Sequence, residues 1–206
     1  MNGPTGDDHW EGVYASTAAT NLGWYEPEPT ASRRLIEAIA TTPSQAVIDV
    51  GAGVSFLVDN LLAHGFTDVT LLDISQHALT EVERRLGKRG RHVTFVHQDV
   101  VTWTPDRHYD IWHDRAVFHF LTDRSARDRY VETAAQALPV GGGLVVATFA
   151  EDGPTQCSGL PTSRYSALDL EATFSAYFSL DEHERTEHVT PGGVVQPFTW
   201  AVLRRT

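Results

Sequence analysis

Residues 46–55 read Ala-Val-Ile-Asp-Val-Gly-Ala-Gly-Val-Ser, an apolar run of strand length that is followed at once by two glycines. Residues 56–64 come next, mix apolar side chains around one helix face and end at Gly65, a residue that commonly terminates helices. Glycine permits positive φ and a close approach of the backbone to a ligand, and the start of a helix offers free N–H groups. The pattern predicts a strand, a ligand-binding turn and a helix.

The rest of the chain continues this alternation. We expect further strands at residues 68–74, 92–98, 109–112 and 143–149, and helices at residues 29–40, 76–86, 123–138 and 170–177. Strands that alternate with amphipathic helices build parallel sheets. Two extended segments, residues 180–189 and 194–203, are separated by Pro191-Gly192-Gly193 and predict an antiparallel hairpin at the end of the sheet. The predicted fold class is α/β.

Composition and charge narrow the class of protein. The 206 residues include 27 acidic and 16 basic side chains, a formal net charge of −11, and no cluster of Lys and Arg is dense enough to neutralise a run of phosphates. We therefore expect no nucleic-acid partner and favour a small molecule or a basic protein segment. The length and the even composition are those of one structural domain.

Signals for export or membrane insertion are not evident in the sequence. The first eight residues lack the basic and apolar regions of a signal peptide, and no apolar run approaches the roughly 18 residues of a membrane span. Cys157 is the single cysteine, so no intrachain disulfide forms. We expect a cytoplasmic protein without membrane contact, and the spacing of Cys157 and the histidines predicts no metal site. The sequence gives no indication of the oligomeric state.

Acidic residues follow the second and third predicted strands. Asp73 ends the second strand about 20 residues after the glycine turn, where a ribose diol is commonly bound. Asp99 and Val100 follow the third strand, where a carboxylate and a backbone N–H suit an adenine ring. The carboxyl ends of parallel strands meet at one edge, so these groups should converge on one ligand. NAD is an alternative ligand, but the dinucleotide motif requires a third glycine where this chain has Phe56.

With this glycine turn, these acids and the terminal hairpin, the chain resembles the class I S-adenosylmethionine-dependent methyltransferases over nearly its whole length. The resemblance implies a Rossmann-like fold: a seven-stranded, mostly parallel sheet flanked by helices, with a C-terminal antiparallel β-hairpin. An N-terminal lid segment and helix, residues 1–44, would precede the cofactor-binding methyltransferase domain, residues 45–206. S-adenosylmethionine would be the cofactor and S-adenosylhomocysteine the product. The cofactor-binding residues would include Asp49, Gly51, Ala52, Gly53, Asp73, Ile74, Asp99 and Val100.

The amino-terminal aromatic residues favour one subgroup of this family. Trp10, Tyr14 and Trp24 are similar to the opening segments of small lysine methyltransferases of citrate synthase and of translation elongation factor. That subgroup adds an acid and a base after the fourth strand, where this chain has Asp114 and Arg115. The resemblance implies that the aromatic rings cover the cofactor and that Asp114 and Arg115 contact it, since aromatic faces attract a sulfonium and exclude water. Alternatively, the rings only pack the N-terminal helix on the sheet.

Three polar residues near the end of the fourth strand are candidate catalytic bases, namely His113, Asp114 and His119. Methyl transfer is a displacement on a carbon that positive sulfur already activates, so a base is needed only if the acceptor arrives protonated. His119 lies in an apolar run and could be a wall residue instead. Asp114 could hold the cofactor or pair with Arg115.

The segment after the fifth strand supplies candidates for binding the methyl acceptor. They are Cys157, Arg164 and Tyr165, and His188 with Gln196 could reach the same rim from the hairpin. An ordinary structured loop with a buried cysteine is the alternative. We therefore predict methyl transfer to a small-molecule or protein-lysine acceptor. A non-catalytic cofactor-binding protein and, less favoured, an NAD-linked oxidoreductase are the alternatives.

Overall fold

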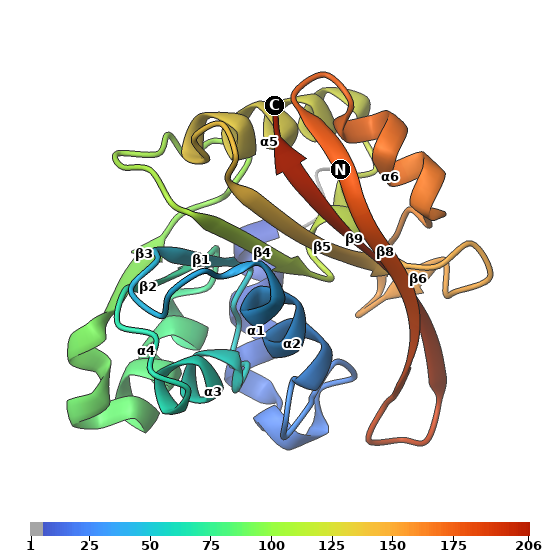
Figure 1. The fold of residues 1–206 in the computed structure, drawn as a ribbon. Helices are drawn as coiled ribbons and strands as arrows, with labels where there is room; N and C mark the ends of the chain where they lie inside the picture. Colours follow the sequence, from blue (N-terminus) through green and yellow to red (C-terminus); the bar gives the residue numbers. More distant parts are fainter. Residues whose placement is uncertain (1–5) are drawn as a thin grey trace.

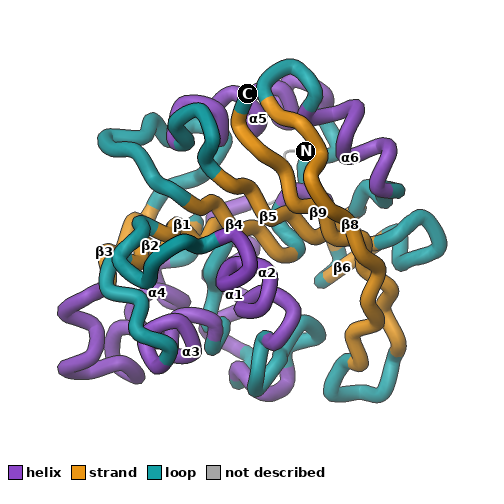
Figure 2. The backbone as a smooth tube through the Cα atoms, viewed as in Figure 1, coloured by secondary structure: helices purple, strands orange, loops and turns teal. Residues whose placement is uncertain are grey.

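The structure, a computed structural model, describes residues 6–206, and residues 1–5 of the predicted lid segment lie outside the described residues. Seven strands form one sheet in the order β3-β2-β1-β4-β5-β9-β8, with helices on both faces (Figure 1, Figure 2). The strands are β1 (Val47–Val50), β2 (Val69–Asp73), β3 (Val93–His97), β4 (Ile111–Arg115), β5 (Gly143–Phe149), β8 (Phe178–Val189) and β9 (Val195–Arg205). The predicted α/β class and the seven-stranded sheet are confirmed.

The strand directions create a point at which the sheet reverses its winding. β1 pairs in parallel with both β2 and β4, and β3 and β5 extend the sheet in parallel on either side. β9 is antiparallel to β5 and to β8, so the predicted terminal hairpin is confirmed. In such sheets ligands bind outside the carboxyl ends of the strands where the order reverses, which here is between β1 and β4.

The helices cover the sheet because each buries an apolar stripe against it. On one face lie α2 (Thr30–Ile39), α3 (Leu57–Ala63) and α4 (Gln76–Leu86), and on the other α5 (Arg124–Ala137) and α6 (Ala167–Phe174) (Figure 1). β1 and β2 are buried along their whole length, as parallel strands between two helical layers must be. α6 begins three residues earlier than predicted, since Ser166 and Asp169 form a capping box.

α1 (Gly6–Ser16) is a helix that the sequence pattern did not predict. The Glu11 carboxylate accepts hydrogen bonds from the backbone N–H groups of Gln76 at 2.6 Å and His77 at 3.2 Å, at the start of α4. The first N–H groups of a helix have no partner within it and attract an anion. These hydrogen bonds to α4, together with the packing of Val13 and Tyr14 on a small buried cluster, hold α1 in place.

Two further differences from the predicted elements lie beside the site. β4 runs to Arg115, three residues beyond the predicted end, because its buried polar residues His113 and Asp114 find partners inside the protein. A small hairpin of β6 (Gln156–Cys157) and β7 (Leu160–Pro161) follows β5 and was not predicted. No helix within residues 6–206 combines the length and apolar character that crossing a membrane requires.

Candidate functional site

A cavity of about 290 Å³ lies at the carboxyl ends of the parallel strands. Residues from the ends of β1, β2, β3, β4 and β5 line it, and α1, the following loop, the small hairpin and β9 close it from outside. Of the predicted cofactor-binding residues, the lining includes Trp10, Tyr14, Trp24, Gly51, Asp73, Ile74, Asp99, Val100 and Arg115. The strand ends that the sequence predicts to lie at one edge of the sheet thus share one cavity.

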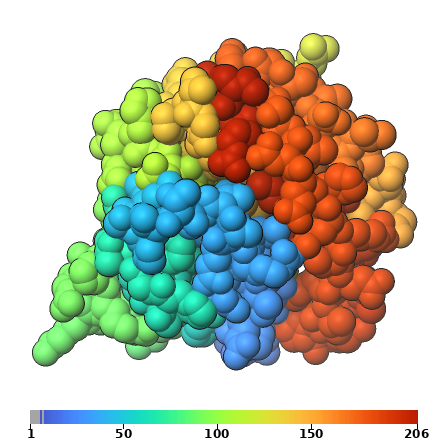
Figure 3. Space-filling model, in the orientation of Figure 1, coloured from blue at the N-terminus to red at the C-terminus, as the bar shows by residue number. Residues whose placement is uncertain are grey.

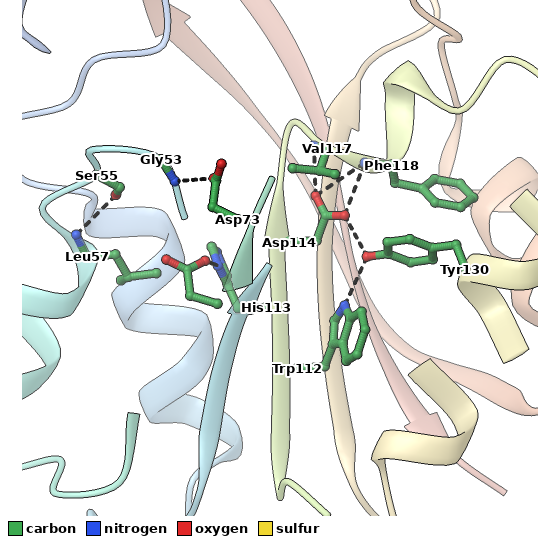
Figure 4. A network of polar contacts seen from close by, with 11 residues as sticks. Gly53, Ser55, Leu57, Asp73, Trp112, His113, Asp114, Val117, Phe118 and Tyr130 are labelled. Atoms are coloured by element: carbon green, nitrogen blue, oxygen red, sulfur yellow. Dashed lines mark hydrogen bonds and ion pairs between the residues drawn. The ribbon is translucent and has the colours of Figure 1, made fainter. Parts of the chain in front are cut away.

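Asp73 connects the glycine turn to the end of β2. One carboxylate oxygen accepts from the Gly53 N–H at 2.7 Å (Figure 4). The other accepts from the Ser75 N–H at 2.8 Å. Burial raises the pKa of Asp73 to about 6, against the opposing effect of these two hydrogen bonds, and the Asp49 and Glu11 carboxylates raise it further. Each carboxylate oxygen has a second lone pair, so Asp73 can still accept hydrogen bonds from a ligand diol.

The glycine turn leaves no room for a side chain. Gly51 has a φ of +63°, and a Cβ at this position would overlap the Val117 side chain. Positive φ costs a non-glycine residue about 1–2 kcal/mol, and the overlap with Val117 adds to that cost. The backbone of the turn therefore comes close to the cavity only because this residue is glycine.

Gly51→Ala is expected to lower the free energy of unfolding by about 2–4 kcal/mol and to weaken ligand binding at the turn. The midpoint of urea unfolding measures the first effect. Gly12→Ala is the matched control, because a Cβ at Gly12 in α1 meets no atom within 4 Å and its φ is not positive. A Gly51→Ala midpoint equal to that of Gly12→Ala would show that the turn tolerates a side chain.

Three aromatic rings from the N-terminal segment form a lid over the cavity. The Trp10 and Trp24 rings meet edge to face at 5.7 Å, and the Tyr14 ring meets Trp24 at 6.1 Å. A Cβ on Gly53 would meet the Tyr14 hydroxyl, so this ring lies directly on the glycine turn. Burial, reinforced by the Asp73 carboxylate, raises the pKa of Tyr14 well above its ordinary value, so the hydroxyl stays protonated. From here on, the name lid segment is used for residues 6–26, which are part of the predicted lid segment and helix at residues 1–44.

Arg115 joins the end of β4 to the lid segment. Its guanidinium donates to the Trp24 carbonyl at 3.1 Å and to the Glu26 carboxylate at 2.9 Å, and it lies 5.1 Å from the centre of the Phe198 ring. Burial lowers the pKa of Arg115, while Glu26 and Asp49 oppose that shift. Arg115 is thus a buried cation at the middle of the cavity wall, with one face on an aromatic ring.

The three predicted bases do not line this cavity. The His113 Nδ1 atom lies 2.7 Å from a carboxylate oxygen of Asp49. Both residues line a smaller cavity of about 50 Å³ beneath the glycine turn. Ala52 lines that smaller cavity too, and Gly53 faces Tyr14 and Asp73. Burial, followed by the Arg115 charge, lowers the pKa of His119 to about 3, so this imidazole is a poor proton acceptor at neutral pH.

Asp114 points away from the cavity into the core beneath α5. Its carboxylate accepts from the Tyr130 hydroxyl at 2.5 Å and from the Val117 N–H at 2.9 Å and the Phe118 N–H at 3.1 Å (Figure 4). Trp112 completes the network by donating to the Tyr130 oxygen at 2.9 Å. The structure therefore supports a bracing role for Asp114, and it brings Asp114 next to neither Arg115's guanidinium nor the cavity.

In the strand order, β5 and β9 lie on the opposite side of the reversal point from β2 and Asp73, and the cavity residues on that side are mostly apolar. We call this side the apolar end, and its lining consists of Phe120, Phe149, Cys157, Leu160, Gln196 and Phe198. Burial raises the pKa of the Cys157 thiol, so it stays protonated. Of the other predicted acceptor-binding residues, Arg164 is exposed and Tyr165 packs on the Phe118 ring at 5.5 Å, and neither lines the cavity. The sequence analysis does not single out the three phenylalanines: Phe120 follows His119, Phe149 ends β5 and Phe198 lies within β9.

Comparison with known proteins agrees with this architecture. Residues 47–142 match the family described as "Methyltransferase domain". The match covers 96 of the 206 residues. The "eEF1A lysine and N-terminal methyltransferase" of Mus musculus is 26% identical over 151 residues, which make up 70% of this chain and 21% of the relative. The chain therefore spans about a fifth of the length of the curated relatives that it matches.

Solved structures extend the likeness beyond residues 47–142. The Burkholderia thailandensis 1,6-didemethyltoxoflavin-N1-methyltransferase, with S-adenosylhomocysteine bound, is 20% identical, has a TM-score of 0.72 and covers 94% of this chain and 81% of its own. The N-methyltransferase NodS from Bradyrhizobium japonicum WM9 is 14% identical with a TM-score of 0.72 over 96% of this chain and 99% of its own. The predicted Rossmann-like fold is confirmed. The comparisons agree with the predicted methyltransferase family, with the predicted enzyme class and with S-adenosylmethionine as cofactor.

Proposed function

We propose that the protein transfers a methyl group from S-adenosylmethionine to a small molecule that binds at the apolar end of the cavity. The observation that carries this proposal is the division of the cavity into two ends. Asp73 and Asp99 provide carboxylates at one end, and the lining of the other consists of apolar side chains, a thiol and an amide. A nucleoside cofactor suits the first end and a compact organic acceptor the second.

The residues at the polar end fit the cofactor by their chemistry. Asp73 can accept hydrogen bonds from a ribose diol, and Asp99 with the backbone of Val100 lies where an adenine ring would reach. Trp10, Tyr14 and Trp24 present aromatic rings to the cavity, and such rings attract a sulfonium. When bound, S-adenosylmethionine supplies a methyl group on positive sulfur. The protein's part is to position the acceptor and to exclude water.

The lining of the apolar end favours an uncharged or anionic acceptor over a lysine ammonium. A lysine must lose a proton before it can accept a methyl group, and a neighbouring carboxylate or imidazole ordinarily assists. Within residues 6–206, the side chains that line this end include neither, and the nearest charged group in the lining is the Arg115 cation. The Gln196 amide has no hydrogen-bond partner in this same part of the chain and can bind a polar atom of the acceptor.

Replacing apolar-end residues should change acceptor use and leave cofactor binding intact. We expect Gln196→Ala and Leu160→Ala to raise the acceptor KM about tenfold, with the Kd of S-adenosylmethionine within twofold of the unaltered protein. The measurement is transfer of labelled methyl to aromatic thiols, arylamines and phenols, and in parallel to lysine peptides. Val194→Ala, an exposed change on the same hairpin, is the matched control.

Protein-lysine methylation is the second candidate, because the Mus musculus relative is named for it. Label that appears only in lysine peptides would favour that function and reject a small-molecule acceptor. Cofactor binding without transfer to any class would favour a non-catalytic binding protein. The cytoplasmic location stays a prediction.

A further inference from the structure

His188 lies at a place where the C-terminal hairpin meets the lid segment. Figure 3 shows the N-terminal part of the chain, in blue, beside the hairpin, in orange to red, on one face of the molecule. The His188 side chain is only 5% exposed. Its Nε2 lies 2.8 Å from the Gly23 carbonyl oxygen and its Nδ1 lies 3.3 Å from the Glu26 carboxylate. The sequence suggests that His188 could reach the rim of the acceptor site, but the lining of the cavity does not include it.

Both partners of the His188 ring are hydrogen-bond acceptors. A backbone carbonyl and an ionised carboxylate cannot donate, so a neutral imidazole, with one N–H, satisfies only one of them. The imidazolium donates to both. Burial raises the pKa of Glu26, but the hydrogen bond from His188 and the Arg115 charge outweigh it, so the pKa of Glu26 is lowered. Glu26 is therefore an anion between the Arg115 guanidinium and the His188 ring.

The contacts of His188 and Arg115 fall on consecutive carbonyl groups of the lid segment. His188 contacts the carbonyl of Gly23, and Arg115 donates to the carbonyl of Trp24. The side chains of His188 and Arg115 both contact the carboxylate of Glu26. The Trp24 ring, which lines the cavity, is thus fixed through its own backbone from the hairpin and from β4. If these hydrogen bonds were lost, water could satisfy the two carbonyl groups, and the lid segment would no longer be attached to the hairpin and to β4.

We propose that His188 is a positioning residue that holds residues 23–26 closed over the cofactor end of the cavity. The charged groups around it are Glu26 in the lid segment and Arg115 on β4, with His113 acting on Glu26 from the same strand. Without this ring, residues 23–26 lose both contacts with the hairpin. Lid closure, and with it cofactor affinity, then weakens.

The test compares His188→Ala and His188→Gln with the unaltered protein. Calorimetric titration with S-adenosylhomocysteine at pH 6.5 is expected to show about tenfold weaker binding by His188→Ala, and a smaller loss for His188→Gln, whose amide keeps one donor at either position. His183→Gln is the matched control, an exposed histidine on the same strand.

A second readout does not depend on the cofactor. Hydrogen exchange of residues 22–27 in the ligand-free protein should be faster in His188→Ala than in His183→Gln, with the sheet strands unchanged. Equal exchange in the two variants, or equal Kd values for His188→Ala and His183→Gln, would overturn the proposal. The inference rests on the proposed cofactor, but the exchange result tests the role of His188 separately. If the unaltered protein does not bind S-adenosylhomocysteine and exchange is still faster in His188→Ala, the proposed cofactor is rejected and the positioning role of His188 is kept.

Discussion

Asp73→Ala is expected to weaken the binding of S-adenosylmethionine and of S-adenosylhomocysteine by at least about a hundredfold. A hydrogen bond to a charged group contributes about 1.5–3 kcal/mol, and a ribose diol would donate two to this buried carboxylate. The substitution also leaves the N–H groups of Gly53 and Ser75 without their acceptor, which loosens the glycine turn. Isothermal titration with both compounds measures the loss.

Asp73→Asn separates ligand contact from support of the turn. The asparagine oxygen can still accept from one of the two backbone N–H groups, so the fold should survive. With one of its two lone pairs used in this way, the amide oxygen can accept from only one hydroxyl of a diol. NAD titrated in parallel tests the oxidoreductase alternative. Tight binding of NAD, or unchanged S-adenosylmethionine affinity in the folded Asp73→Ala protein, would reject the proposed role of Asp73.

The raised pKa of Asp73 adds a dependence on pH to the same experiment. Because burial raises the pKa to about 6, the free protein takes up a proton here as pH falls below that value. The protonated group accepts hydrogen bonds poorly, so cofactor affinity should fall below pH 6, at most about tenfold per pH unit. Asp73→Asn should show a flat profile over the same acidic range.

The sheet and its ligand edge could be predicted because the signals are local. The glycine turn after an apolar strand, and Asp73 and Asp99 after the next two strands, mark positions that any parallel sheet brings to one edge. The hairpin followed from a Pro-Gly-Gly turn between two extended runs. These features depend on residues near one another in the chain, and the structure confirms the elements that they predict.

The parts that could not be predicted depend on contacts between distant residues. Nothing in residues 6–16 indicates that Glu11 reaches the start of α4, 65 residues away, and this contact helps to hold α1. Likewise, His113 and Asp114 looked like catalytic groups because polar residues at a strand end are often functional. Their partners, Asp49 and Tyr130, come from other elements and direct both side chains away from the main cavity. Whether either residue takes part in catalysis stays a prediction for experiment.

Asp114→Ala is expected to lower the free energy of unfolding by about 3–5 kcal/mol, the largest stability effect among the substitutions considered. Asp114 is fully buried, and its removal leaves the Tyr130 hydroxyl and the N–H groups of Val117 and Phe118 without an acceptor. Each such buried group costs about 1–3 kcal/mol. Urea unfolding followed by circular dichroism measures the loss.

Tyr130→Phe provides the matched comparison, because it removes one donor and keeps the ring in the core. We expect a loss of about 1–3 kcal/mol, and a double variant that loses less than the sum of the two single changes, since both act on one hydrogen-bonded network. Additive losses would show that the two residues contribute independently. If instead Asp114→Ala kept its stability but lost methyl transfer, Asp114 would act in catalysis and not as a brace.

A pH series distinguishes these roles further. Burial raises the pKa of Asp114 to about 6, above the 3.8 of an exposed aspartate, even though the Tyr130 hydroxyl opposes the shift. The folded state therefore binds this proton more tightly than the unfolded state, so this carboxyl adds stability as pH falls from about 6 to about 4, and the contribution is lost as pH rises through 6. Asp114→Asn removes that dependence and leaves the one from Asp73, so its stability should change less than that of the unaltered protein over this window. A curve parallel to that of the unaltered protein would mean that Asp114 is already ionised well below pH 6, and that its hydrogen bonds outweigh its burial.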